Sequence, residues 1–292
     1  MLSAILPARE NAYYDFDDFD CRIYNESPRQ GDAVFFVITP KNGAVPDKII
    51  IDEERELFFL PFNGRYISLF ATDFRQDAKN YSISIVYESN SKRSTRHILI
   101  NFAKREFDVW MLPKTIPRAQ TRTEEEIENR KREVRNIYNS IKPVTPKLYI
   151  LDGYTSPIKD AGDAEYRSFG QKRLRNGEEV SRHKGVDISR PRGTPVFAPL
   201  SGKAVLTGND YFYEGNILII DNGLGIYSLF CHLDRFAVKE GDIVASGDII
   251  GYVGSTGRST GPHLHWQVKF LLKDIYPLSF SFINELIEDI IK

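Results

Sequence analysis

Four of the five histidines in the sequence lie between residues 183 and 265. Two of them, His263 and His265, are one residue apart, after a glycine-rich stretch and at the start of an apolar run over residues 266–272 that predicts a strand. Side chains two apart on a strand point to the same face. Such a pair offers a metal ion one ligand and, beside it, one group that moves protons. A His-x-His pair by itself is a weak signal.

The other histidines of this half strengthen that signal. His183 stands in His-Lys-Gly-Val-Asp187, and His232 stands in Phe-Cys-His-Leu-Asp. Catalytic zinc typically takes three protein ligands from histidine and carboxylate and keeps an open position for water. Four histidines and Asp187 exceed that need, so imidazoles remain for proton transfer. The fifth histidine, His97, stands alone on a predicted strand, which favours a structural or surface role.

His232 lies on a predicted strand over residues 226–233. Alternation along that strand predicts that His232 shares a face with Ser228 and Phe230. Its neighbour Cys231 is then expected to point to the opposite face as a buried thiol of the core.

The composition excludes several classes of protein. The 292 residues are 41% hydrophobic and 27% charged, with a formal net charge of -1, which allows two domains and shows no bulk preference for nucleic acid or an anionic membrane. The two cysteines, Cys21 and Cys231, are too few for a disulfide framework or a cysteine-based zinc module. No apolar run reaches about 18 residues, so we expect no membrane-spanning helix.

The first ten residues have neither a basic leader nor an apolar stretch long enough for a signal peptide. Two readings follow: the protein is not exported, or the sequence begins after a leader that has been removed.

Short apolar runs rich in β-forming residues predict an N-terminal domain over residues 1–110. The expected strands are 33–39, 48–51, 57–61, 66–70, 81–87 and 97–102. Their spacing and turn residues favour an antiparallel sandwich of immunoglobulin type.

Residues 111–146 predict a helical connector. The pattern Thr121-Arg-Thr-Glu124 resembles a capping box, and apolar residues from Ile127 to Ile141 recur at helical spacing until Pro143. We expect a strut that packs on one domain. Residues 147–292 then return to strands and glycine turns and end in an amphipathic helix over 280–291, which predicts a second, mostly β domain.

Several motifs of this second domain together resemble the LytM/lysostaphin-type zinc metallopeptidases, which cut peptides of bacterial peptidoglycan. The motifs are His183-x-x-x-Asp187, Gly193-Thr-Pro-Val-x-Ala198-Pro, Tyr227-Ser-Leu-Phe-x-His232-Leu, Gly241-Asp-x-Val-x-x-Gly247 and Gly254-Ser-Thr-Gly-Arg-Ser-Thr-Gly-Pro-His-Leu-His-Trp266. They occur in the family's order and spacing. The resemblance covers residues 155–277 and implies a compact antiparallel β peptidase domain of LytM type.

The resemblance implies one Zn²⁺ per chain, held by His183, Asp187 and His265. It also implies that His232 and His263 are the two active-site histidines that do not bind the metal. Peptidoglycan stem peptides are the expected partner, which a wall-cutting enzyme meets in the periplasm or outside the cell.

Departures from the family's pattern fall outside the ligands. The family often has His-Gly where this chain has Asn222-Gly223, and Tyr-x-His where it has Phe230-x-His232. The positions expected to line the substrate groove are Asn222, Phe230, Ser259 and Thr260. The segment 156–182 is longer than usual, and it is expected either to rim the groove or to cover it.

The leading prediction is a zinc endopeptidase that hydrolyses peptidoglycan cross-links. A carboxypeptidase that trims stem peptides and a non-catalytic module that activates an amidase remain alternatives, as does an enzyme held latent by regulatory contact from the N-terminal domain or segment 156–182. A phosphate loop is disfavoured because no Lys-Ser/Thr follows the glycines of 254–261. A lipoyl-type carrier is disfavoured because no lysine marks a hairpin tip in 238–253.

Overall fold

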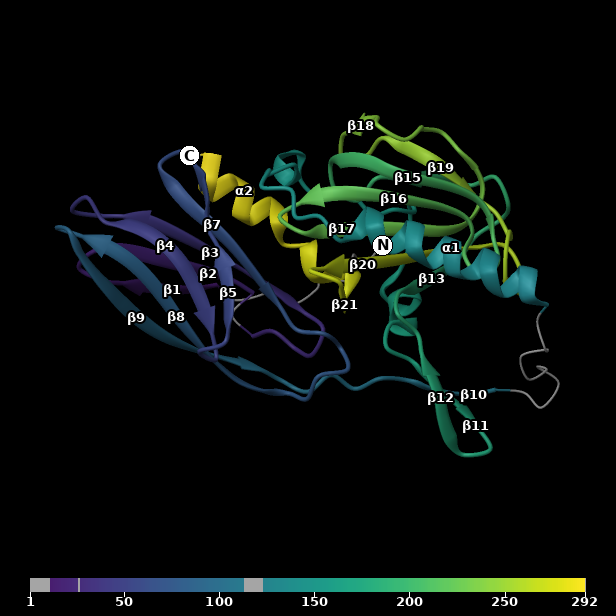
Figure 1. Cartoon of the computed structure of the whole chain (residues 1–292), viewed down its shortest axis with the longest axis horizontal. Coiled ribbons are helices and arrows are strands. Elements are labelled where there is room, and N and C mark those ends of the chain that lie inside the picture. Colours follow the sequence, from purple (N-terminus) through teal and green to yellow (C-terminus); the bar gives the residue numbers. More distant parts are fainter. Residues whose placement is uncertain (1–10, 26, 113–122, 292) are drawn as a thin grey trace. The chain divides into compact units, whose positions relative to one another are not determined.

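The computed structural model describes residues 11–25, 27–112 and 123–291, which divide into two compact units (Figure 1). Unit 1 comprises residues up to 105 and from 279 onward, and unit 2 comprises residues 106–278. Both units consist mainly of strands, as the sequence predicts. No helix in the described ranges is both long and apolar enough to span a membrane.

Unit 1 contains two antiparallel sheets. The first has the order β1-β2-β3-β7-β6, with bounds β1 (Ala12–Asp15), β2 (Phe19–Tyr24), β3 (Ala33–Pro40), β7 (Arg65–Ala71) and β6 (Leu60–Phe62). The second has the order β5-β4-β8-β9, with bounds β5 (Arg55–Phe58), β4 (Val45–Ile51), β8 (Lys79–Ser89) and β9 (Lys92–Phe102). The ring of Phe70 in the first sheet meets those of Tyr81 and Phe102 in the second edge-on, with centroids 5.1 and 5.4 Å apart. The two sheets therefore form a sandwich, while an immunoglobulin strand order stays a prediction.

The C-terminal helix α2 (Ile283–Ile291) belongs to unit 1. The rings of Phe280 and Phe282 lie edge-on to Phe35 of β3, at 6.1 and 6.0 Å between centroids. Just before them, the Ser279 hydroxyl donates to the Asp32 carboxylate at 3.0 Å. The expected C-terminal domain over residues 147–292 therefore differs from the structure, because this tail completes the core of the other unit.

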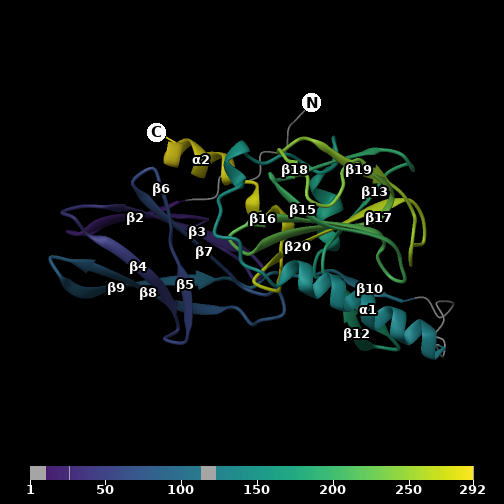
Figure 2. The ribbon, with the colours of Figure 1, turned by 45° about the horizontal axis from the view of Figure 1, so that its top comes forward.

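Unit 2 is built on one large sheet whose main path runs β13-β20-β17-β16-β15-β18 (Figure 2). Its strands are β13 (Val186–Ser189), β14 (Pro195–Phe197), β15 (Gly202–Tyr211), β16 (Gly215–Gly223), β17 (Ile226–Phe236), β18 (Ile243–Val244), β19 (Ile249–Val253), β20 (His263–Phe270) and β21 (Lys273–Ile275). A separate small sheet has the order β10-β11-β12, with bounds β10 (Val109–Met111), β11 (Lys172–Arg175) and β12 (Glu178–Arg182). In Figure 1 the β11–β12 hairpin extends away from the large sheet.

Helix α1 (Glu124–Ile141) packs on unit 2, as expected of a strut. Its capping box joins Thr123 and Glu126, with hydrogen bonds of 2.9 and 3.2 Å, rather than starting at Thr121, which lies outside the described residues. Ile141 is buried against β16 and β17, whereas Ile127 and Val134 are exposed. Only the C-terminal end of the predicted apolar stripe therefore contributes to a core.

Candidate active site

Pairing of β13 with β20 brings two of the predicted ligands together. Asp187 lies directly opposite His265, and Ser189 lies opposite His263. Directly opposed residues of an antiparallel pair point to the same face. The Asp187 Oδ1 atom is therefore only 2.8 Å from His265 Nδ1, and His263 shares that face as the spacing predicts.

His183, from the loop before β13, completes a cluster of three. Its Nε2 lies 3.1 Å from both Asp187 Oδ1 and His265 Nδ1. One potential ligand atom from each residue falls within 4.8 Å of the others, and no other such group of at least three metal-binding side chains occurs among the described residues. The structure thus brings together the three residues that the sequence analysis selected as ligands.

The orientation of His183 suits metal binding. Its ring is buried, and Nδ1 donates to the backbone carbonyl of Ser168 at 2.7 Å. Because a carbonyl oxygen only accepts, the proton is on Nδ1 and the lone pair of Nε2 faces Asp187 and His265. Two imidazole nitrogens and one carboxylate oxygen are the donor set of a catalytic zinc site.

Close backbone packing shapes the same cluster. A Cβ atom added to Gly185 would lie 2.4 Å from the Trp266 carbonyl oxygen and 2.9 Å from His265 Nε2. Only glycine therefore lets the chain pass this close to the His265 ring. Burial by itself would raise the pKa of Asp187, but the neighbouring His183 and His265 rings outweigh it and hold that pKa well below its usual range. Asp187 is thus a charged carboxylate near neutral pH.

His232 joins the cluster through a β-bulge. Cys231 lies opposite His265, so strict alternation would turn His232 to the other face of the sheet. Instead, His232 has a φ of 61°, and the register between β16 and β17 shifts at this point. The bulge turns the His232 ring to within 4.7 Å of the His263 ring and 6.1 Å of the His265 ring, between centroids.

The expected face of His232 is therefore wrong, although the side chain reaches the site. Ser228 and Phe230, its predicted companions, are fully buried on the far face, where Phe230 pairs with Trp266. Cys231 is a buried thiol, as predicted. It lies on the face of the ligands rather than opposite His232.

The glycine-rich loop between β19 and β20 orients the two histidines outside the predicted ligand set. His232 Nδ1 donates to the Thr256 carbonyl at 2.9 Å, and His263 Nδ1 donates to the Gly261 carbonyl at 2.8 Å. Both rings thereby hold the proton on Nδ1 and leave Nε2 as an acceptor. Burial lowers the pKa of His232 to about 4, so this imidazole is neutral near pH 7.

These side chains line one groove of about 1050 Å³. Ser259 and Thr260 line it too, as expected. Asn222 and Phe230 do not, because both are buried: the Asn222 amide bonds the Ser201 carbonyl, and Phe230 packs in the core. The expectation for these two positions is corrected by the structure.

The β11–β12 hairpin and β10 form a wall of the groove, with Trp110, Arg173 and Val180 among the lining residues. Segment 156–182 thus rims the groove, and the Asp187 side chain keeps 33% of its surface exposed. Arg173 and Arg258 also line the groove, and neither position was predicted. The basic run of residues 172–175 was the available signal for the first.

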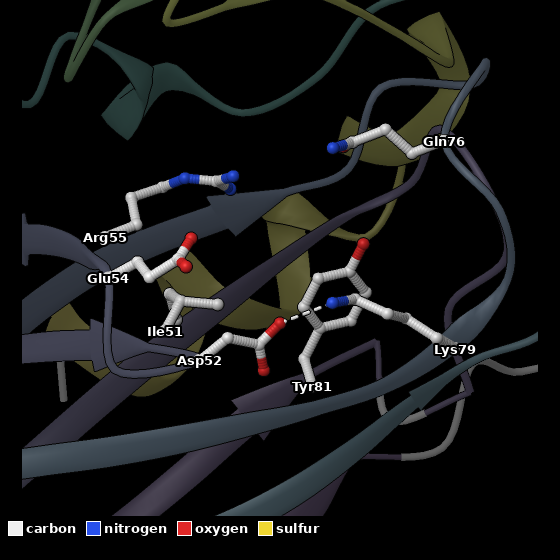
Figure 3. A pocket seen from close by; sticks show the side chains of 7 residues that line it. All are labelled: Ile51, Asp52, Glu54, Arg55, Gln76, Lys79 and Tyr81. Atoms are coloured by element: carbon white, nitrogen blue, oxygen red, sulfur yellow. Dashed lines mark hydrogen bonds and ion pairs between the residues drawn. The ribbon is translucent and has the colours of Figure 1, made fainter.

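A second hollow, of about 440 Å³, lies in unit 1 (Figure 3). Two of its charges pair with each other, because Asp52 accepts from Lys79 Nζ at 2.6 Å, and Asp52 also accepts from the Ser82 backbone at 2.9 Å.

Comparison with known proteins agrees with the geometry of unit 2. Residues 181–277 match the family model described as Peptidase family M23. Over 99 residues the chain is 42% identical to the DD-carboxypeptidase/endopeptidase Mpg of Neisseria meningitidis serogroup B. The aligned stretch covers 34% of this chain and 23% of the relative. Over 86 residues it is 45% identical to lysostaphin of Staphylococcus simulans, covering 29% of this chain and 17% of the relative.

The chain therefore spans less than a quarter of the length of these curated relatives. A crystal structure assigned to peptidase M23 from Pseudomonas aeruginosa matches at a TM-score of 0.58 and 23% identity, over 87% of this chain and 95% of that one. This last likeness concerns the fold and extends over most of the chain.

Proposed function

We propose that the protein is a zinc-dependent endopeptidase that hydrolyses peptide cross-links of peptidoglycan, and that residues 181–277, which match the model of Peptidase family M23, form its metallopeptidase domain. The observation that carries the proposal is the convergence of His183, Asp187 and His265 within 4.8 Å, in one groove with two further imidazoles. The names of the relatives, a DD-carboxypeptidase/endopeptidase and lysostaphin, support a cell-wall substrate.

In this proposal His183 Nε2, His265 Nδ1 and Asp187 Oδ1 hold one zinc ion. Bound zinc supplies Lewis acidity, which polarises a peptide carbonyl and makes water a better acid. The Ser168 carbonyl supports the arrangement by fixing the tautomer of His183, and Asp187 lowers the net positive charge of the centre.

His232 and His263 are the proposed proton-transfer groups. Each presents Nε2 toward the groove side of the sheet because Nδ1 is held by a loop carbonyl. A neutral imidazole accepts the proton of the attacking water, and an imidazolium donates to the leaving amine or stabilises the oxyanion.

Two alternatives share the site. A carboxypeptidase would remove the terminal residue of an uncross-linked stem peptide, whereas an amidase-activating module would cut no peptide. The presence of all five histidine and aspartate positions favours an enzyme. We further propose a location in the periplasm or outside the cell, where peptidoglycan lies, and we keep regulatory contact by unit 1 as part of the proposal.

The deciding experiment combines metal analysis with digestion of purified cross-linked muropeptides by the full chain. We expect one zinc per chain, product masses that report a cut cross-link, and loss of both in His265→Ala. The matched control is His97→Ala, because His97 is exposed on β9 in unit 1. Zinc without cleavage would favour the activating module, and loss of only a terminal residue would favour the carboxypeptidase.

A further inference from the structure

Three arginines of the groove, Arg173, Arg175 and Arg258, have no carboxylate partner among the described residues. Arg173 comes from β11 and Arg258 from the glycine-rich loop, and both line the groove that holds the histidines. Several other arginines of unit 2 are ion-paired: Arg130 with Glu214, Arg182 with Glu179, Arg190 with Glu165 and Arg192 with Asp234. Arg173 and Arg258 are in addition placed against aromatic rings, those of Trp110 and Tyr213.

Arg173 is held in place by an aromatic ring. It pairs with Trp110 in the parallel β10–β11 register, and its guanidinium carbon lies 5.6 Å from the centre of that ring. The Nε atom is buried and has no hydrogen-bond partner in the described part of the chain. A ring face compensates a buried cation only partly, so Arg173 retains an unsatisfied donor.

Arg258 is fixed from a different segment. Its backbone N–H donates to the Tyr213 carbonyl at 3.1 Å, and its guanidinium lies 5.7 Å from the centre of the Tyr213 ring. The charges of Arg258 and Asp187 both act on Arg173, with opposite signs, and burial lowers the pKa of Arg173. Since Asp187 lies 3.1 Å from His183 Nε2 and 2.8 Å from His265 Nδ1, its charge already serves the candidate metal-binding cluster.

We propose that Arg173 and Arg258 form a carboxylate-binding subsite, which makes the groove selective for peptides with a free carboxylate close to the bond that is cut. A planar guanidinium matches a carboxylate with two parallel hydrogen bonds, and a peptide carboxylate in the groove would supply the ion pair that Arg173 and Arg258 lack among the described residues. The inference rests on the proposed peptidase function, because it takes the substrate to be a peptide in this groove.

A binding experiment tests the subsite without relying on catalysis. The probes are Nα-acetyl-L-lysyl-D-alanyl-D-alanine with a free C-terminal carboxylate and the same peptide as its carboxamide. Both peptides are titrated by calorimetry into the zinc-loaded full chain that carries His263→Ala, a substitution that slows cleavage. The two titrations give the affinities for the acid and for the amide. We expect the acid to bind at least about tenfold more tightly than the amide, as befits charge-assisted hydrogen bonds.

Variants then assign the preference. Arg173→Gln and Arg258→Gln should each bring the ratio of acid to amide affinity close to one. Arg173→Lys should leave an intermediate ratio, because lysine keeps the charge but cannot form the two parallel hydrogen bonds of a guanidinium. Arg192→Gln, whose side chain pairs with Asp234 outside the groove, should keep the full ratio. Equal loss of acid and amide binding in both glutamine variants would mean a purely structural role and would overturn the subsite.

Cleavage of muropeptides by the otherwise unmodified protein, measured in parallel, separates this inference from the proposed function. An acid preference that the arginine variants abolish, without any cleavage, supports the subsite and refutes the peptidase. Cleavage without an acid preference, or with a preference that survives both glutamine variants, refutes the subsite and leaves the peptidase in place.

Discussion

Cys231 and His232 are neighbours in β17, yet both line the same groove. Side chains of adjacent strand residues normally point to opposite faces. The positive φ of His232 removes that restriction by inserting an extra residue opposite β16. A backbone conformation that costs about 1–3 kcal/mol for an ordinary residue is retained where it delivers an imidazole to the site.

The two histidines outside the ligand set should affect turnover without affecting metal content. His232→Ala and His263→Ala each remove a proton-transfer group, so we expect kcat to fall about 10²-fold or more. Zinc per chain, measured by metal analysis, should stay at the level of the unmodified protein. Zinc loss comparable to that of His265→Ala would contradict the assignment of these two residues.

Gly185 should control metal affinity. Gly185→Ala places a methyl group against the Trp266 carbonyl and the His265 ring, which must shift. We expect zinc affinity to fall about 10- to 100-fold, the size of effect seen when the support of a ligand is disturbed. Competition with a chelator measures it. Gly162→Ala is the matched control, because nothing lies within 4 Å of its added methyl group; equal affinity in both variants would count against the packing argument.

The metal-free protein should lose stability as the pH falls from 6.5 toward 4. Burial lowers the pKa of His232 to about 4, whereas the unfolded chain binds this proton near pH 6.5. Below pH 6.5 the unfolded state therefore holds an extra proton, and the linkage amounts to about 3 kcal/mol at most. Urea unfolding at pH 7 and pH 4 should show a larger loss in the unmodified protein than in His232→Gln. Parallel losses would show that His232 does not titrate in this way.

Both cysteines should be inert in the folded protein. Burial raises the pKa of Cys21 to about 12 and that of Cys231 well above its ordinary value, so neither thiol forms a thiolate near pH 8. A chromogenic disulfide reagent should count no reactive thiol before denaturation and two after it. Rapid labelling of the native protein would indicate local opening of β2 or β17.

Helix α1 should depend on one end of its apolar stripe. Ile141 is 6% exposed among Ile217, Tyr227 and Leu229, whereas Ile127 on the same helix is 42% exposed. We expect Ile141→Ala to lower the free energy of unfolding by about 2–5 kcal/mol and Ile127→Ala by less than about 1 kcal/mol. Denaturant unfolding measures both, and similar losses would refute the asymmetry.

The sequence predicts the cluster of histidines and Asp187 better than it predicts the residues that line the groove around this cluster. His263 and His265 follow the two-residue period of a strand, so their shared face is predictable without a structure. The bulge at His232 is not, because it is set by pairing with β16 and by the Thr256 carbonyl rather than by local propensity. Because the bulge was not predicted, Phe230 was expected on the face of His232 and therefore in the groove.

In unit 1 the apolar runs predicted most strands but missed β1 and β2, whose aspartates mask the β pattern. The pattern of α2 correctly predicts a packing helix, with Ile283, Leu286 and Ile290 buried. An amphipathic pattern predicts that one face of a helix is buried, but it does not identify the surface on which that face packs. The sequence analysis therefore assigned α2 to the C-terminal domain. The position of Arg173 in the groove was not predicted, because it depends on pairing with Trp110, about 60 residues earlier in the chain.

Unit 1 is discontinuous in the chain, since residues from Ser279 onward complete the core that β3 begins. The ribosome must therefore synthesise all of unit 2 before the C-terminal segment of unit 1, which begins at Ser279. At that stage Phe35 of the sandwich lacks its aromatic partners, Phe280 and Phe282, whereas every residue of unit 2 has been synthesised. The order of synthesis thus favours unit 2 as the first to complete its folding. The packing of Phe280 and Phe282 on unit 1 then comes last.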